Sequence, residues 1–91
     1  MPMPRKIKPT GRIQDFSVLK KRNFSIEQIS PSMAILRARV WNQGVYEQVL
    51  AFLRGIKGKL IIDNERMSKK AAIRYIISRL QRRNAVHIAV V

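Results

Sequence analysis

The chain has no cysteine, one histidine and only five acidic residues among its 91 residues. The absence of cysteine excludes disulfides, thiolate zinc sites and catalytic thiols. The few carboxylates are scattered and form no acid–base pair, and His87 lies in an apolar segment. We therefore expect no enzyme and no metal or other cofactor. No apolar run approaches the roughly 18 residues of a membrane span, so we expect no membrane partner.

Positive charge is what the sequence has in excess. Nineteen Lys and Arg give a formal net charge of +14 at pH 7. Charge of one sign destabilises a compact domain through self-repulsion, and nucleic acid is the commonest polyanion that offsets it. These features predict a non-catalytic DNA- or RNA-binding protein of regulatory or accessory role, located in the cytoplasm or on the nucleoid, or in the nucleus for a eukaryotic or viral source.

A second function class stays open at this point. A strongly basic surface also fits a protein-binding module that docks on an acidic partner protein. An inhibitor encoded by a phage or mobile element is an example of this class. Salt dependence of nucleic-acid binding separates the two alternatives, because only phosphate contacts release condensed counterions.

The chain divides into three regions of different character. Residues 1–12 are basic and rich in proline, which predicts a flexible arm. In residues 13–32 the hydrophobic residues follow neither the strand period nor the helix period for long, which predicts a partly ordered extension. Residues 33–91 contain the clear periodic segments and predict one folded core domain, consistent with a hydrophobic fraction of 46%.

Hydrophobic periodicity predicts a small α+β core, a three-stranded sheet packed on two helices. Alternation over 34–41 indicates a strand, and helical spacing follows from an Asn42 cap to a stop at Gly55. The remaining segments complete a β-α-β-α-β order: a strand at 59–63, a helix at 69–83 between Ser68 and Asn84, and a strand at 86–91. The apolar terminal strand also predicts an edge through which two copies could form a homodimer.

A winged-helix variant is the alternative fold. The pattern from Ser68 through the apolar stripe to Asn84 and Val86 is similar to the recognition helix and following strand of winged-helix domains. The similarity covers about 20 residues. The middle helix of such a domain has no room between Gly58 and Met67.

The segment 69–83 is the strongest candidate for a phosphate-binding surface. At 100° per residue, Tyr75, Arg79 and Arg82 fall opposite the apolar stripe, and Lys69 and Lys70 oppose the helix dipole at its start. A polyanion would offset that cost. The predicted contact residues of this segment are Lys69, Lys70, Arg74, Tyr75, Arg79, Arg82 and Arg83.

Two further groups complete the predicted nucleic-acid interface. Arg37, Arg39 and Trp41 alternate along the first predicted strand and suggest a platform on which a base could stack. The second group lies in the N-terminal third and predicts an arm that follows a phosphate backbone: Arg5, Lys6, Lys8, Arg12, Lys20, Lys21 and Arg22.

Overall fold

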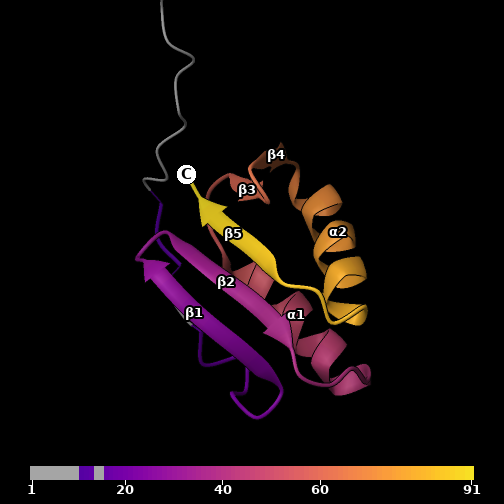
Figure 1. Ribbon diagram of the computed structural model, residues 1–91. Coiled ribbons are helices and arrows are strands. Elements are labelled where there is room, and N and C mark those ends of the chain that lie inside the picture. Colours follow the sequence, from indigo (N-terminus) through magenta and orange to yellow (C-terminus); the bar gives the residue numbers. More distant parts are fainter. Residues whose placement is uncertain (1–10, 14–15) are drawn as a thin grey trace, which may run out of the picture.

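The computed structural model describes residues 11–13 and 16–91. These residues form a single sheet with two helices (Figure 1). In chain order the elements are β1 (Phe24–Ser30), β2 (Met33–Ala38), α1 (Gln43–Gly55), β3 (Leu60–Ile62), β4 (Glu65–Met67), α2 (Lys69–Gln81) and β5 (Val86–Val90).

The sheet has five antiparallel strands in the order β1-β2-β5-β3-β4. The α+β class is therefore confirmed, whereas the three-stranded sheet and the β-α-β-α-β order are wrong. The two strands that the sequence analysis missed, β1 and β4, are the edges of the sheet. A five-stranded antiparallel sheet with two helices also leaves no place for the winged-helix alternative.

The C-terminal strand β5 lies at the centre of the sheet, between β2 and β3 (Figure 1). Ala34 faces Ile88 on one side, and Ile62 faces Ile88 on the other. Because both of its edges are paired, β5 offers no free edge to a second copy. The route to a homodimer that the sequence suggested is therefore closed.

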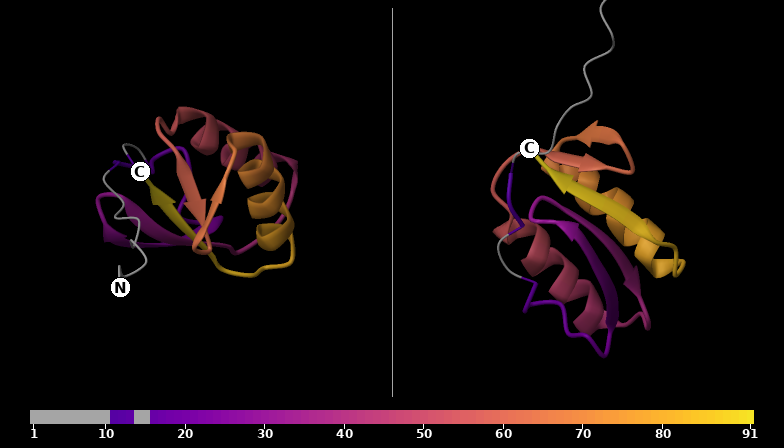
Figure 2. Two further views of the ribbon diagram at one scale, coloured as in Figure 1. Left: turned by 90° about the horizontal axis from the view of Figure 1, so that it is seen from above. Right: turned by 60° about the vertical axis from the view of Figure 1, so that its left-hand side comes forward.

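Both helices lie on the same face of the sheet (Figure 2). Alternate strand residues such as Leu36, Val86 and Ile62 point to this face and are at most 1% exposed. They pack with the buried residues of α1 and α2 in one core. On the opposite face, where Ile35 pairs with His87, side chains such as Arg37 are more exposed.

The segment before β1 packs on the core. Ile13 and Leu19 are buried, and the ring of Phe16 stacks on Phe52 of α1 with centroids 5.6 Å apart. The stretch 13–32, expected to be a partly ordered extension, thus supplies core side chains and the whole of β1. In the predicted arm 1–12, Arg5, Lys6 and Lys8 lie outside the described residues.

The predicted N-caps are confirmed and one predicted helix end is not. Asn42 Oδ1 accepts from the amide of Val45, and Ser68 Oγ accepts from the amide of Ala71. At the end of α2 the left-handed residue is Arg83, with φ of 63°, and not Asn84. The Asn84 amide instead donates to the carbonyl of Arg79.

Candidate nucleic-acid interface

The buried face of α2 is wider than its Ile/Leu stripe. Ala72, Ile76 and Leu80 are fully buried, while Ile73 is only partly so. Ala72 belongs to the buried face, so the centre of the buried face lies closer to Tyr75 and Arg79 than the Ile/Leu stripe indicated. Tyr75 and Arg79 are therefore partly buried at the flank of this face and do not lie on the outward face predicted from the sequence.

Tyr75 and Arg79 are held in a polar cluster with Asp63. The Tyr75 hydroxyl donates to Asp63 Oδ2 at 2.5 Å, and the His87 amide donates to Asp63 Oδ1 at 2.9 Å. Arg79 Nη2 donates to the carbonyl of Ala85 at 3.2 Å, and its Nε lies 3.9 Å from Asp63 Oδ2. The cluster joins the β3–β4 turn, the end of α2 and the start of β5.

The electrostatics of this cluster follow from the same contacts. The hydrogen bond to Asp63 raises the pKa of Tyr75, and desolvation adds to the increase. Asp63 has φ of 48° and Asn64 has φ of 68°, as a two-residue turn of type I′ requires. Asp63 therefore serves both as a turn residue and as an acceptor.

Lys69 is occupied by the end of the other helix. Its Nζ donates to the carbonyl of Ile56 at 2.8 Å and to that of Arg54 at 3.3 Å. A cation is favoured at the C-terminal carbonyls of a helix. The position of Lys69 at the start of α2 thus has an explanation within the fold, and phosphate is not needed for it.

The outward side of α2 carries cations of a different kind. Lys70, Arg74, Ser78 and Arg82 follow one another at intervals of four residues and are all exposed. Each interval is a rise of about 6 Å along the helix. Among the described residues, the side chains of Lys70, Arg74 and Arg82 have no hydrogen-bond or ion-pair partner, and α2 contains no acidic residue. We call Lys70, Arg74 and Arg82 the outer stripe.

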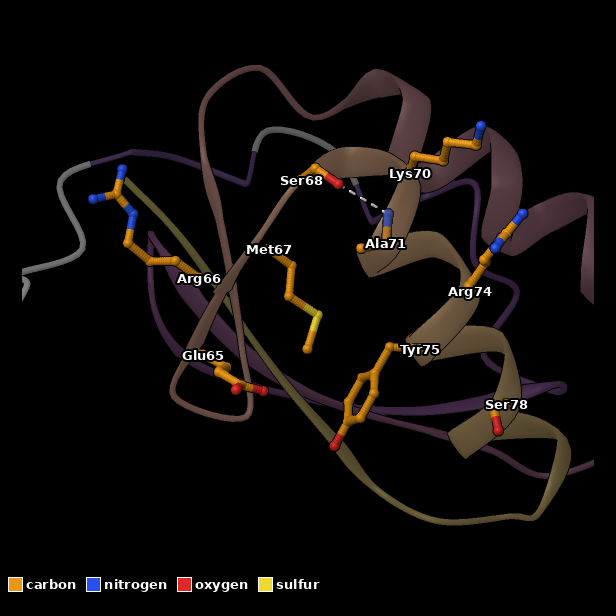
Figure 3. Close-up of a pocket in the computed structure, with 9 residues that line it drawn as sticks. All are labelled: Glu65, Arg66, Met67, Ser68, Lys70, Ala71, Arg74, Tyr75 and Ser78. Atoms are coloured by element: carbon orange, nitrogen blue, oxygen red, sulfur yellow. Dashed lines mark hydrogen bonds between the residues drawn. The ribbon is translucent and has the colours of Figure 1, made fainter.

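An open groove of about 800 Å³ separates this side of α2 from β4 (Figure 3). Met67 points into the groove from β4, and the ring of Tyr75 forms part of its opposite wall. Arg66 and Glu65 stand on the strand side. Lys70 and Arg74 extend outward from the helix side, so the groove has an apolar floor and a mostly cationic rim.

Arg66 is the residue near this site that the sequence analysis did not single out. It falls between the predicted strand 59–63 and the predicted helix 69–83, and β4, with only three residues, shows no period of its own. The signal that could have found it is the pair Asp63-Asn64, a turn dipeptide directly after an apolar run. A hairpin placed there makes Arg66 a strand residue opposite Ile61.

The predicted platform of Arg37, Arg39 and Trp41 does not form, since β2 ends at Ala38. Arg37 is exposed on the face away from the helices. Arg39 Nε donates to the Phe24 carbonyl at 3.3 Å. Trp41 packs against the core and meets Tyr46 edge-on, with centroids 6.4 Å apart.

The remaining predicted cations lie apart from the outer stripe. Lys20, Lys21 and Arg22 are exposed in the turn before β1, at the opposite edge of the sheet from β4. Arg12 is exposed in the short segment before Ile13. Arg83 follows α2, and its Nη1 donates to the carbonyl of Gln81 at 2.9 Å. The structure therefore does not gather all predicted contact residues on one surface.

Within residues 11–13 and 16–91, no three His, Asp or Glu side chains lie close enough together to hold a metal ion. In the same ranges neither helix combines the length and the apolar character needed to cross a bilayer. The sequence matches no protein-family model, no curated protein and no solved structure.

Proposed function

We propose that this protein binds nucleic acid without catalysis, and that the outer stripe of α2 makes the principal phosphate contacts. The observation that carries the proposal is the state of Lys70, Arg74 and Arg82: three exposed cations in one row, without partners among the described residues. A row of cations held close together by a rigid helix repels itself, and phosphates relieve that repulsion.

The charges around the stripe favour the same partner. Arg66 lies on the neighbouring strand β4 with its side chain directed away from the groove, and one acid, Glu65, lines the groove. Phosphate contacts of this kind give affinity and orientation but little base reading. We therefore propose binding with weak sequence preference, to DNA or RNA.

A salt series with two matched variants tests this proposal. Fluorescence anisotropy measures binding to labelled duplex and single-stranded DNA and RNA of one length. If wild type neutralises about six phosphates of a duplex, log K falls against log salt with a slope near −5. The variant Lys70→Gln/Arg74→Gln/Arg82→Gln should reduce the slope to about half and the affinity at least tenfold, roughly, at 0.1 M salt.

The matched control is Lys20→Gln/Lys21→Gln/Arg22→Gln, which removes the same charge at the other edge of the sheet. We expect a smaller loss of affinity in this control. Both variants should keep the thermal stability of wild type, because none of the six side chains has a partner among the described residues. Equal losses in the two variants would show that net charge, and not the outer stripe, governs binding. Absence of binding by wild type would reject the proposed function.

A further inference from the structure

Within residues 11–13 and 16–91, no strand pairs with the backbone of Arg66 on the outer edge of the sheet. Ile62 and Glu65 close the two-residue turn, so they exchange the hydrogen bonds nearest to it. Pairs along an antiparallel ladder alternate, which makes the next pair, Ile61 and Arg66, a pair without hydrogen bonds. The amide and carbonyl of Arg66 therefore point away from β3.

The pairing of β3 with β5 supports this assignment independently. Lys59 and Val91 exchange both backbone hydrogen bonds, at 3.3 and 2.9 Å. Two residues on, Ile61 and Ala89 are again a hydrogen-bonded pair by the same alternation. The backbone of Ile61 is thus occupied by β5, and no group of β3 remains for Arg66.

The side chains beside this edge favour different residue types on the two faces of an added strand. A residue placed opposite Arg66 shares the face of the Arg66 side chain, and an acidic residue there makes a favourable cross-strand pair. Its neighbours in the added strand face the groove, where Met67, Ala71 and the ring of Tyr75 offer apolar surface.

From these features we propose that β4 is a docking edge for an extended acidic segment of a partner protein, one that alternates acidic and apolar residues and adds to the sheet as a strand. Main-chain hydrogen bonds to Arg66 would supply affinity, and the groove would select the alternation. This docking does not depend on nucleic-acid binding.

The net charge of the protein favours an acidic partner segment over a second copy of this chain at the edge of β4. A net charge of +14 opposes edge-to-edge pairing of two identical chains, and a charged residue on a short edge strand adds to that protection. The same charge favours an acidic strand. The other edge, β1, is less suitable, because its register shifts between Gln28 and Ser30.

A labelled peptide of the sequence Glu-Leu-Glu-Leu-Glu-Leu-Glu serves as the probe. Its control has the same composition in two blocks, Glu-Glu-Glu-Glu-Leu-Leu-Leu. In fluorescence anisotropy the alternating peptide should bind at least tenfold, roughly, more tightly than the control. It should also slow hydrogen exchange of the Arg66 amide by about tenfold or more, measured by NMR on the full chain.

Two variants at one position separate backbone pairing from charge. Arg66→Gln removes the charge and keeps the amide, whereas Arg66→Pro removes both. Proline is tolerated at an edge amide that makes no ladder bond, so both variants should fold, as checked by thermal unfolding. The proline variant should bind the alternating peptide about tenfold more weakly than the glutamine variant. The two should bind nucleic acid alike.

Equal peptide affinity of the two variants, equal affinity for the two peptides, or unchanged exchange of the Arg66 amide would overturn the docking edge. None of these outcomes touches the outer stripe, whose own test is the salt series. If Arg66→Pro did not fold, the exchange measurement on wild type would still decide the proposal.

Discussion

The two sides of α2 carry similar residues and use them differently. On one flank, Tyr75 and Arg79 bind Asp63 and the Ala85 carbonyl, and Lys69 caps α1 at the helix start. On the outer side, Lys70, Arg74 and Arg82 have no partner among the described residues. The comparison teaches that the number of cations on a helix does not define a binding surface. What matters is which cations the fold has already occupied.

Loss of the acceptor on the occupied side should have the largest effect on stability. Asp63→Ala removes the partner of the Tyr75 hydroxyl and of the His87 amide and places alanine at positive φ. We expect a loss of about 3 kcal/mol in the free energy of unfolding. Urea denaturation measures it, with Asp63→Asn as the control.

Asparagine tolerates the left-handed conformation and keeps one acceptor oxygen, so the control should lose about 1 kcal/mol. A stability of Asp63→Ala within about 0.5 kcal/mol of wild type would mean that the cluster contributes nothing measurable.

Arg79→Gln should mainly reduce stability, whereas Arg82→Gln should mainly weaken nucleic-acid binding. Arg79→Gln loses the hydrogen bond to Ala85 and should reduce stability by about 1 kcal/mol, with a smaller change in nucleic-acid affinity. Arg82→Gln should leave stability unchanged and reduce the salt slope by about 1 for a duplex. Parallel behaviour of the two variants in both assays would remove the distinction between the two sides of α2.

The neighbouring pair Lys69 and Lys70 gives a smaller contrast. Lys69→Gln removes the charged donor from the C-terminal carbonyls of α1 and should cost about 0.5–1 kcal/mol in thermal unfolding. Lys70→Gln has no such contact to lose, so its melting temperature should match that of wild type. A lower melting temperature in Lys70→Gln than in Lys69→Gln would contradict the assigned cap.

The smallest expected effect is the pH dependence contributed by Tyr75. Its pKa is raised in the folded protein, so the folded state holds this proton more tightly than the unfolded state does. The stability that Tyr75 contributes is present below the unfolded pKa of about 10 and is lost as pH rises through the higher folded pKa. Unfolding of wild type and Tyr75→Phe between pH 8 and about 11 should therefore show a difference in stability that shrinks at the alkaline end. A constant difference would mean that the hydroxyl does not titrate as described.

The sequence was informative where one local pattern decides the structure. Asn42 and Ser68 are N-caps as predicted, and all three predicted strands exist. The edge strands were missed because β1 has only Phe24 fully buried and β4 has three residues, so neither shows a clear period. Their pairing depends on β2 and β3, which sequence periodicity does not report.

The candidate site was only partly accessible to the same reasoning. Helical periodicity placed Arg82 on the outward face together with Tyr75 and Arg79, and it could not show that Asp63 reaches Tyr75 from 12 residues away. Nor could it show that Lys69 reaches the end of α1. Partners of this kind are contacts between elements, and they decide which charges remain available.

A titration of the labelled protein with duplex DNA or RNA, followed by the NMR shifts of its amides and of its Lys and Arg side-chain groups, tests the central claim most directly. We predict that the largest changes fall on Lys70, Arg74 and Arg82, while the side-chain signals of Lys69 and Arg79 stay nearly constant. Changes of equal size on both groups, or changes concentrated at residues 20–22, would contradict the assignment of the outer stripe as the nucleic-acid surface.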